Sequence, residues 1–472
     1  MKLKELLPEY SGKVSDDKLS SVALNSQEIS KGDLYISIAK DISLQKKYCQ
    51  EALKNGASFA LTNNPSIQNI PKKIIFVKNL EKKLGLLSNK FFENPSKKIT
   101  VFGITGTNGK SSVSYYLFQL FNQIKKSSGL ISNINLKNPG IYVSKLTTPD
   151  IFSLNKILYD FLLNKKEAAI FEVSSHGIKQ KRIDGINFDY GCLTSFSRDH
   201  LDYHSSMKEY EKVKESFFAD NKFKGGVINA DSKIGKRILL KNKEFVSISM
   251  EDKKSDIFIE KNKSKKVINS PWGNLEMPNQ IFADYKMFNI AAALGLFCLS
   301  LNKINLRKLN LEKIKDLPGR LEKINIASNK HCYIDYAHTP DALEKVLQSL
   351  KNKYRGNLIC LFGCGGDRDQ GKRVLMGSVA DSLADKIILT DDNPRFENPN
   401  QIVMHISEGI KDIKKVKIIS DRTKAIKYGL KLLREDRKES VLLLAGKGHE
   451  FNQEIKRKTF QSNDYEIVRS LI

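Results

Sequence analysis

The sequence lacks the features of a secreted, zinc-binding or membrane protein. It has no CxxC pair and no cysteine–histidine cluster with the spacing of a zinc site. Its six cysteines are therefore expected to be reduced thiols in a cytoplasmic protein: Cys49, Cys192, Cys298, Cys332, Cys360 and Cys364. No apolar run approaches the ~18 residues that a membrane span needs, so we expect no membrane insertion. The first residues, MKLKELLPEY, lack the apolar core of a secretory signal.

Acidic residues are scarce relative to basic ones. There are 79 Lys and Arg against 53 Asp and Glu, which gives a formal net charge of +26 at pH 7. Such an excess is typical of nucleic-acid-binding proteins. Here, however, the basic residues are spread from end to end and are not interleaved with aromatic side chains as in a single-strand-binding surface. We therefore expect no nucleic-acid partner. A positive field would also favour an anionic small substrate.

The 472 residues correspond to roughly three domains of ~150 residues. Breaks at Asn94-Pro95-Ser96 and at Leu317-Pro318-Gly319-Arg320 place the domains at 1–97, 98–318 and 319–472. Alternating strands and helices predict an α/β fold with mostly parallel sheets, the last of them doubly wound and Rossmann-like. The expected strands are 33–39, 58–62, 74–77, 99–104, 168–173, 190–194, 332–335, 358–362, 386–390, 417–419 and 441–445. The expected helices are 50–56, 80–92, 112–123, 283–299, 341–350, 374–383 and 422–433, and a peripheral hairpin is expected within 241–278.

A glycine-rich segment, GITGTNGKS at 103–111, stands between a buried strand and an apolar-periodic helix. Glycines let backbone N–H groups approach phosphate oxygens, and the helix N-terminus adds partial positive charge. Lys110 would supply a charge for the β- and γ-phosphates, and the Ser111 hydroxyl can ligate Mg²⁺. A tight turn is the alternative reading, but strand, loop, GKS and helix together predict an ATP site. Its residues are Gly106, Thr107, Asn108, Gly109, Lys110, Ser111 and Ser112.

This TGTNGKS variant of the loop resembles the Mur ligases and their folate-ligase relatives. Two further motifs, EVSSHG at 172–177 and SRDHLDYH at 197–204, resemble the UDP-N-acetylmuramoyl-tripeptide synthetases of that family. Glu172 ends an expected strand, where a carboxylate faces the ligand crevice and suits Mg²⁺. The resemblance implies that Glu172 and His200 help to hold a second Mg²⁺. It also implies that Lys214, in the YxxxK segment 210–214, is carbamylated; from the residues alone Lys214 reads as a solvated helix lysine.

The resemblance further implies a three-domain Mur ligase architecture, with a central P-loop domain, and an ATP-dependent amide ligase. The expected substrates are UDP-N-acetylmuramoyl-L-alanyl-D-glutamate and meso-2,6-diaminopimelate, joined through an acyl phosphate in peptidoglycan precursor synthesis. Lys110, Lys214 and His200 are the expected catalytic residues. Positions implied to bind the UDP-linked dipeptide are Ser26, Thr147, Thr148, Ser174, Gln180 and Arg182. Asn25-Ser26-Gln27 stands where the family usually has D-S-R, and the TTPD segment at 147–150 also reads as a helix N-cap with proline at N1.

The resemblance implies three further residues that bind the nucleotide, namely Asn289, Arg320 and Asp335. The family's G-x-F-N-x-x-N is reduced to Ala283–Asn289, of which only Asn289 is carried over. Arg320, in PGRLE, is implied to touch the phosphates, and Asp335, in DYAHTP, the ribose. DYAHTP also reads as a strand end followed by an N-capped helix with proline at N1.

Three expected strand ends in the last domain carry charged or glycine-rich segments, at the edge where such sheets bind ligands. These segments are GCGGDR at 363–368, DNPR at 392–395 and GKGHE at 446–450. Arginines can pair with carboxylates bidentately, and Glu450 can receive a distal ammonium. The DNPR motif resembles enzymes that add diaminopimelate. The implied diaminopimelate residues are Arg368, Asp392, Asn393, Pro394, Arg395, Gly446 and Glu450.

Three alternatives remain at this point. One is the same reaction with L-lysine, although the lysine-adding relatives lack DNPR. Another is a folylpolyglutamate-type ligase, against which EVSSHG, TTPD and DNPR count. The third, from a different class, is a basic P-loop nucleic-acid motor or binder, for which the sequence holds no helicase-type motif set. We expect a monomer with hinge motion near residue 318.

Overall fold

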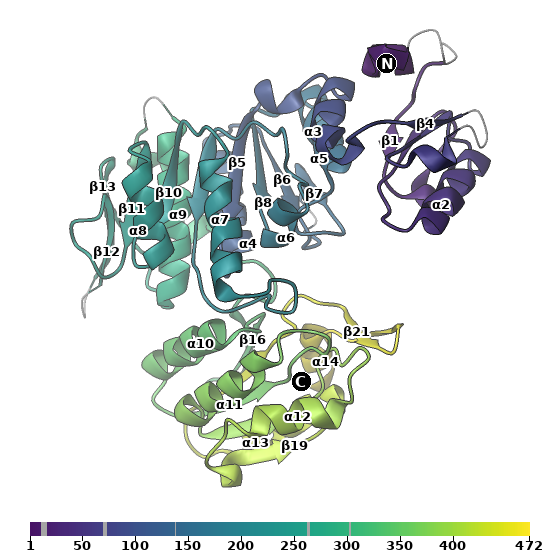
Figure 1. Ribbon diagram of the computed structural model, residues 1–472. Helices are drawn as coiled ribbons and strands as arrows, with labels where there is room; N and C mark the ends of the chain where they lie inside the picture. The colour runs from purple at the N-terminus through teal and green to yellow at the C-terminus, as the bar shows by residue number, and fades with distance from the viewer. Residues whose placement is uncertain (11–16, 69–72, 137, 262–264, 302–303) are drawn as a thin grey trace. The chain divides into compact units, whose positions relative to one another are not determined.

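The computed structural model describes residues 1–10, 17–68, 73–136, 138–261, 265–301 and 304–472, and these form two compact units. The first unit comprises residues 1–103 and 127–189, and the second comprises residues 104–126 and 190–472. Figure 1 labels their helices and strands, coloured from purple at the N-terminus to yellow at the C-terminus.

The first unit begins with a four-stranded parallel sheet in the order β1–β2–β3–β4. Its strands are β1 (Val22–Ala23), β2 (Leu34–Ser37), β3 (Phe59–Thr62) and β4 (Ile74–Phe76), and its helices are α1 (Leu3–Leu6), α2 (Ile42–Lys54) and α3 (Leu80–Phe91). The three strands expected here and the helix expected at 80–92 are confirmed.

Helix α2 is much longer than the helix expected at 50–56. It begins after Asp41, whose carboxylate accepts a hydrogen bond from the Leu44 amide at 2.9 Å. Its buried face carries Gln45 alongside Cys49 and Ala52, while Leu44 is exposed. The apolar periodicity that identifies a helix is therefore broken in its first two turns.

Further strands of the first unit lie in the order β5–β8–β6–β7, and β6 pairs in parallel with both β8 and β7. These are β5 (Thr100–Thr105, whose last two residues belong to the second unit), β6 (Ser128–Ser132), β7 (Ile141–Val143) and β8 (Ala168–Glu172). The helices are α5 (Ile151–Leu163) and α6 (Ser175–Lys179). The strands expected at 99–104 and 168–173 are confirmed, while α5, α6, β6 and β7 are additions to the sequence prediction.

The second unit contains its own run of strands in the order β14–β13–β12–β11–β10–β9. The first four along the chain pair in parallel: β9 (Tyr190–Leu193), β10 (Gly225–Asn229), β11 (Phe245–Ser249) and β12 (Ile257–Lys261). The next two, β13 (Lys266–Ser270) and β14 (Gly273–Glu276), extend the sheet by antiparallel pairing, β13 with β12 and β14 with β13. The hairpin expected within 241–278 is therefore part of a three-stranded antiparallel edge, β12–β13–β14, whose first strand pairs in parallel with β11.

Helices α4 (Lys110–Gln123), α7 (Met207–Ala219), α8 (Lys233–Lys241) and α9 (Asp284–Leu299) accompany these strands. Helix α9 is buried on nearly every side, and Phe297 packs edge-on against Phe121 of α4, with ring centroids 5.2 Å apart. This burial explains the long apolar run at 290–301. No helix among the described residues is long and apolar enough to cross a membrane.

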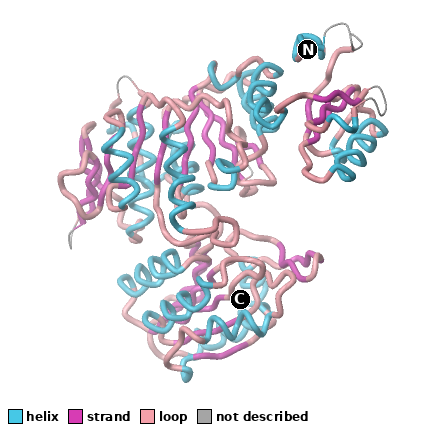
Figure 2. Tube along the Cα trace, in the orientation of Figure 1, coloured by secondary structure: helices cyan, strands magenta, loops and turns pink. Residues whose placement is uncertain are grey.

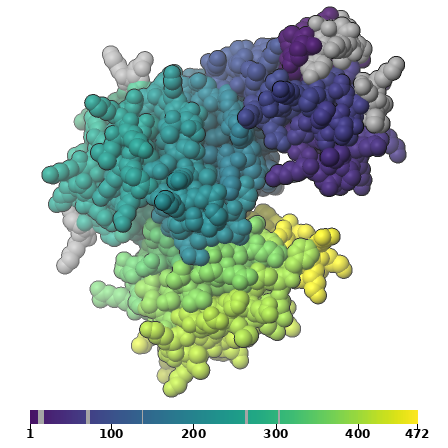
Figure 3. Space-filling model, in the orientation of Figure 1, coloured from purple at the N-terminus to yellow at the C-terminus, as the bar shows by residue number. Residues whose placement is uncertain are grey.

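The last sheet has the order β15–β16–β20–β17–β18–β19, with β15 antiparallel and the other strands parallel. Its strands are β15 (Glu322–Ala327), β16 (Lys330–Asp335), β17 (Asn357–Phe362), β18 (Lys386–Leu389), β19 (Val416–Ile418) and β20 (Ser440–Ala445). A small hairpin, β21 (Asn452–Ile455) and β22 (Lys458–Gln461), follows and lies at the surface, in yellow in Figure 3. Figure 2 shows cyan helices around the magenta strands of this region.

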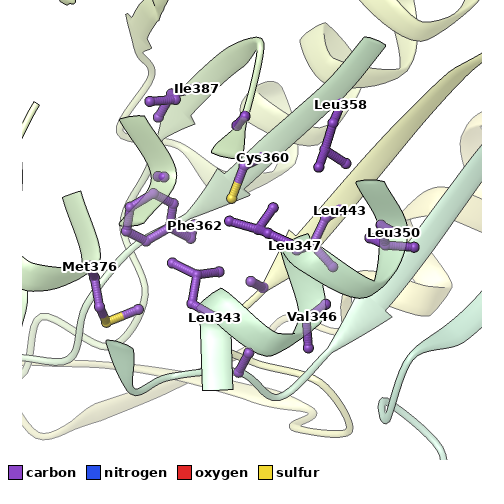
Figure 4. Packing of buried hydrophobic residues seen from close by; sticks show 14 of the residues in the cluster. Leu343, Val346, Leu347, Leu350, Leu358, Cys360, Phe362, Met376, Ile387 and Leu443 are labelled. Carbon is purple, nitrogen blue, oxygen red and sulfur yellow. The ribbon is translucent and has the colours of Figure 1, made fainter. Parts of the chain in front are cut away.

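Both faces of this sheet are covered, as the alternating pattern predicts. Helices α10 (Pro340–Lys353), α11 (Gly371–Leu383) and α12 (Pro399–Ser407) share one core cluster with the sheet. Helices α13 (Arg422–Glu435) and α14 (Asp464–Leu471) share the other. Figure 4 shows Leu343 and Leu347 of α10 against Phe362 of β17 and Leu443 of β20. The parallel strands therefore end at one edge of a rigid, doubly covered sheet.

Candidate active site

The predicted phosphate loop joins β5 to α4 and is shaped by two glycines. Gly106 and Gly109 have φ angles of +146° and +89°, which side chains rarely allow. A Cβ at Gly106 would lie 2.0 Å from Thr194 Oγ1, and one at Gly109 would lie 2.6 Å from Asn289 Oδ1. The Thr107 amide donates to the Ser195 carbonyl at 2.8 Å, which fixes the loop to the end of β9. The loop is thus a closely packed turn at a helix N-terminus, as an anion cradle requires.

Lys110 begins α4 and folds back over this loop. Its Nζ donates to the carbonyls of Gly106 at 3.0 Å and Thr107 at 2.8 Å. Ser111 and Ser112 follow in the first turn of α4, and Ser112 is buried. The Lys110 ammonium is therefore held by carbonyls of the loop itself.

Lys214 is not a solvated helix lysine; that interpretation of the residue pattern is wrong. The side chain, on α7, is only 1% exposed, and its Nζ donates to the Gly106 carbonyl at 2.9 Å and to Thr105 Oγ1 at 3.3 Å. Burial, together with the charge of Lys110, lowers the pKa of Lys214 well below its ordinary value, although Asp199 opposes the shift. These surroundings therefore favour the neutral amine of Lys214 over its ammonium.

Asp199 is a further functional candidate, not predicted from the sequence, within the SRDHLDYH motif at 197–204. Its carboxylate lies 3.4 Å from His200 Nε2, 3.7 Å from His338 Nε2 and 3.9 Å from Lys372 Nζ. Burial alone would raise the pKa of Asp199, but its hydrogen bond with His338 and these positive charges hold it well below the ordinary value. His200 has a positive φ of +55°, and its amide donates to the same carboxylate at 2.9 Å. Asp199 therefore orients His200.

The same loop makes ion pairs with the segment before α11. Arg198 donates from Nε and Nη2 to the two oxygens of Asp369, both at 2.9 Å. Arg368, which we expected to bind diaminopimelate, lies 3.3 Å from Asp202. The two-point pair of Arg198 with Asp369 fixes orientation as well as distance.

A cavity of about 920 Å³ in the second unit brings together most of the predicted nucleotide residues. Six of them line it: Asn108, Gly109, Ser112, Asn289, Arg320 and Asp335. Phe282, Tyr285 and Phe288 form an aromatic wall of the cavity, which no motif in the sequence predicts. Those aromatic rings suit a purine base, and the charged residues suit phosphate and ribose.

Asp335 and Arg320 are held firmly at this cavity. The Asp335 carboxylate accepts the Leu321 amide at 2.6 Å and the Ala337 amide at 2.8 Å, and its burial raises its pKa. The Arg320 guanidinium lies over the Tyr336 ring, 4.5 Å from its centroid. The strand end, Thr339 N-cap and Pro340 at N1 expected from DYAHTP are also confirmed.

Six of the seven predicted amino-acid residues lie in the loops after β18 and β20, whereas Arg368 lies in the loop after β17. Asn393 Nδ2 donates to Glu450 Oε2 at 3.0 Å. Arg395, with a positive φ of +51°, donates to Glu454 Oε2 at 2.9 Å and to the Gly366 carbonyl at 2.8 Å. The loop after β18 also contains Pro394 and the buried Asp392. Gly446, with a φ of +104°, directly follows β20. Lys447, which sequence analysis did not single out, lies fully buried among them.

In the first unit, four residues implied to bind the UDP-linked dipeptide cluster together. The Thr148 and Ser174 hydroxyls are 3.0 Å apart, and Arg182 donates to the Thr148 carbonyl at 3.0 Å and to Gln180 Oε1. Thr147 precedes them in the same segment. The helix cap at TTPD differs from the expectation: Asp150 caps α5, so Pro149 precedes the cap and is not at N1.

Ser26 and Glu172 also belong to the first unit. The Ser26 hydroxyl donates to Glu51 Oε2 at 2.8 Å, and Asn25 accepts the Gln27 amide. Glu172 ends β8 and is buried. No cluster of three or more His, Cys, Asp or Glu side chains in the described part of the chain is arranged to hold a metal. Shared ligation of a second Mg²⁺ by Glu172 and His200 stays a prediction.

Comparison with known proteins places the chain in a family. Residues 104–297 match the Mur ligase middle domain, and residues 319–448 match the family described as Mur ligase, glutamate ligase domain. A UDP-N-acetylmuramoyl-L-alanyl-D-glutamate–2,6-diaminopimelate ligase from Coxiella burnetii is 34% identical over 97% of this chain and 96% of its own length. The chain belongs to the Mur ligase family. A ligase of the same description from Wigglesworthia glossinidia brevipalpis is 35% identical and covers 99% of this Mur ligase.

Solved structures agree with the predicted architecture. A structure of a UDP-N-acetylmuramoyl-L-alanyl-D-glutamate–2,6-diaminopimelate ligase covers 100% of this chain and 98% of its own, with a TM-score of 0.67 and 27% identity. MurF ligase from Thermotoga maritima in complex with ADP covers 96% of both chains with a TM-score of 0.65, but at 16% identity it shows the fold alone. The same holds for a folylpolyglutamate synthase from Mycobacterium tuberculosis, at 16% identity and a TM-score of 0.62. The α/β Mur ligase fold with parallel sheets is therefore confirmed.

Proposed function

We propose that this Mur ligase joins meso-2,6-diaminopimelate to UDP-N-acetylmuramoyl-L-alanyl-D-glutamate, with ATP converted to ADP and phosphate in peptidoglycan precursor synthesis. The observation that carries the proposal is full-length similarity, at 34–35% identity, to ligases of that description. The DNPR segment lies at the end of β18, where the sheet presents its ligand edge.

The reaction needs activation because a free carboxylate is a poor electrophile. The γ-phosphoryl group of ATP passes to the D-glutamyl carboxylate and gives an acyl phosphate and ADP. The diaminopimelate amine then attacks the acyl carbon, a C–N bond forms, and the C–O bond to phosphate breaks. The amine loses a proton to solvent or to a base in the process. The protein positions the reactants and stabilises negative charge.

The nucleotide fits the cavity and loop of the second unit. Asn289 and Asp335 would contact the nucleoside, and the loop amides and Lys110 would hold the phosphates. Arg320, fixed over Tyr336, would neutralise charge on the phosphates. Lys110 must leave the loop carbonyls to reach the γ-phosphoryl group, so nucleotide binding is expected to reorient it.

The neutral amine of Lys214 supports its proposed carbamylation. Only an unprotonated amine attacks carbon dioxide, and the burial of Lys214 favours that form. Within the second unit, the carbamate and the Ser111 hydroxyl would offer oxygen donors and His200 an imidazole, which suit Mg²⁺. Glu172 of the first unit stays a proposed ligand on the family resemblance. Bound Mg²⁺ would supply further neutralisation of phosphate charge. Asp199 would orient His200 for this task.

The amino-acid side is proposed at the loops after β17, β18 and β20. Guanidinium groups of Arg395 and Arg368 would pair with carboxylates of diaminopimelate, and Glu450 would accept an ammonium. Arg368 is paired with Asp202, so the substrate carboxylate would replace that partner. In the first unit, Arg182 and the hydroxyls of Thr148 and Ser174 would hold the acidic dipeptide.

Phosphate release by the purified protein tests the proposal. With UDP-MurNAc-dipeptide and ATP present, we expect release with meso-diaminopimelate and far slower release with L-lysine. Release with a folyl-glutamate acceptor, or equal rates with both amino acids, would contradict it. Lys110→Ala is expected to abolish turnover, while Lys212→Ala, an exposed lysine on α7, serves as the charge control.

Arg395→Ala tests the amino-acid site separately. We expect a higher KM for diaminopimelate with an unchanged KM for ATP, because Arg395 lies outside the residues lining the nucleotide cavity. An unchanged KM for diaminopimelate would remove the assignment.

The division into domains 1–97, 98–318 and 319–472 also remains a proposal, supported by family matches at 104–297 and 319–448. We propose a cytoplasmic monomer. Size-exclusion chromatography with light scattering tests the oligomeric state.

A further inference from the structure

Lys447 is a fully buried lysine in the loop after β20. Its side chain is 0% exposed, and it stands between Gly446 and Gly448, whose φ angles are +104° and +51°. A Cβ at Gly448 would lie 2.7 Å from Tyr336 Cβ, so the loop packs tightly against its neighbours. A buried ammonium is costly unless it is paired, so its partners identify what it does.

The Lys447 ammonium joins three segments. Its Nζ donates to the Asn452 carbonyl at 2.6 Å, to Asn393 Oδ1 at 3.3 Å and to Glu450 Oε2 at 3.3 Å. Asn393 and Glu450 are also joined directly, through Asn393 Nδ2 and Glu450 Oε2 at 3.0 Å. The lysine, the amide and the carboxylate therefore form a closed triangle of hydrogen bonds.

This triangle uses only one of the two Glu450 oxygens. Oε2 accepts from both Lys447 and Asn393, while the one hydrogen bond of Oε1 within the described part of the chain is long, 3.4 Å from the Tyr336 hydroxyl. Oε1 is thus the atom of Glu450 that can receive a new donor. Because Lys447 and Asn393 hold Oε2, their positions decide where Oε1 points.

We propose that Lys447 is a positioning residue for the amino-acid substrate: its buried ammonium fixes Asn393 and keeps Glu450 as an oriented anion whose Oε1 receives a substrate ammonium. This inference rests on the proposed function, because it deepens the role of Glu450 in the amino-acid site. Lys447 itself does not touch the reacting atoms.

The charges around Glu450 make the role testable by pH. Burial and the neighbouring Asp392 carboxylate raise the pKa of Glu450, and Lys447 and Asn393 oppose that shift. Tyr336 and, from α13, Arg422 are further ionisable groups near Glu450. Without Lys447 the pKa of Glu450 rises further, so at neutral pH more of it is protonated and unable to hold an ammonium. The defect should therefore shrink as the pH rises.

The test compares Lys447→Met with the parent enzyme by steady-state kinetics between about pH 6.5 and pH 9. We expect the KM for diaminopimelate to rise at least tenfold at pH 7 and to recover by severalfold at high pH, with the KM for ATP within twofold of the parent. Lys447→Arg should restore much of the loss, and Lys458→Met, at an exposed lysine of β22, should resemble the parent. A parental KM in Lys447→Met, or a defect of equal size at every pH, would overturn the proposal.

A second background keeps the test decisive if Lys447→Met fails to fold. When Lys447 is removed in the Glu450→Gln background, the Glu450 carboxylate is already absent and cannot be left without its cation. The double variant Lys447→Met/Glu450→Gln should therefore fold. The proposal requires that the second change adds less than threefold to the KM of Glu450→Gln and that the pH dependence disappears; a larger addition overturns it. Parent enzyme without diaminopimelate-dependent phosphate release would instead mean that the proposed function has failed.

Discussion

The buried pair of Arg422 and Asp464 gives a sharp prediction about stability. Arg422 opens α13 and Asp464 opens α14, and their side chains are 1% and 0% exposed. Arg422 Nε and Nη2 donate to the two Asp464 oxygens at 2.7 and 2.6 Å, and Nη2 also reaches the Ala445 carbonyl at 3.1 Å. Burial alone would lower the pKa of Arg422, but the Asp464 charge more than offsets this and raises it. Asp464 thus keeps a buried cation next to the end of β20.

Asp464→Asn removes the charge and keeps the shape. Breaking one partner of a buried ion pair costs about 3–5 kcal/mol, because the remaining charge stays desolvated without its partner. The amide oxygen still accepts one hydrogen bond, so we expect the lower end, about 3 kcal/mol. At about 2–4 °C per kcal/mol for a unit of 150–250 residues, the calorimetric transition of the proposed domain 319–472, measured in the full chain, should shift down by about 6–12 °C.

Two variants control for other causes. Glu435→Gln removes the partner of Lys431, a pair that is 3.7 Å apart with side chains 66% and 61% exposed, and should change stability by less than about 0.5 kcal/mol. Replacing both buried residues, Arg422→Met with Asp464→Leu, should cost less than Asp464→Asn alone, because no lone charge remains. A melting temperature for Asp464→Asn within about 2 °C of the parent would refute the reasoning.

Three further predictions concern the active site. Gly106→Ala should weaken ATP binding at least tenfold by calorimetric titration, because its Cβ would lie 2.0 Å from a side-chain oxygen, whereas Gly225→Ala, whose nearest neighbour is 3.4 Å away, should bind normally; equal affinities would contradict this. If Lys214 is carbamylated, activity should fall in carbon-dioxide-free buffer and recover with bicarbonate, and Lys214→Arg should show no such response; a parent enzyme indifferent to bicarbonate would argue against the carbamate. Arg198→Lys loses the two-point pair with Asp369, and because Arg198 is 38% exposed we expect a cost of only about 1 kcal/mol. This cost should appear as a severalfold lower kcat with little change in melting temperature. An unaltered kcat would show that the pair is dispensable.

Buried strands were the most predictable part of the fold. Strands β16, β17, β18 and β20 are short apolar runs, and their burial on both faces explains why the runs are nearly continuous. Helices were less predictable where their buried face is mixed. Helix α2 buries Gln45, and α7 buries Lys214, so neither shows a clean apolar stripe.

Site residues could be predicted where a motif follows a strand, because topology then fixes the edge at which they lie. Asn108, Asn289 and Asp335 come from distant segments and line one cavity. Contacts within loops could not be predicted in this way. That Asp199 faces His338 depends on side-chain directions after two different strands, which periodicity does not encode.

Lys214 and Lys447, both fully buried, show why burial alone does not define a role. Lys214 donates to a carbonyl and a hydroxyl and lies near the positive charge of Lys110. Its surroundings therefore favour the neutral amine, which is the nucleophilic form. Lys447 donates to a carboxylate as well as to a carbonyl and an amide oxygen, so its nitrogen is engaged in three hydrogen bonds that hold it in place. If these environments decide the chemistry, carbon dioxide should modify Lys214 and leave Lys447 unmodified in the same molecule. Peptide mass mapping after trapping of carbamates would separate the two, and modification at Lys447 would contradict the argument.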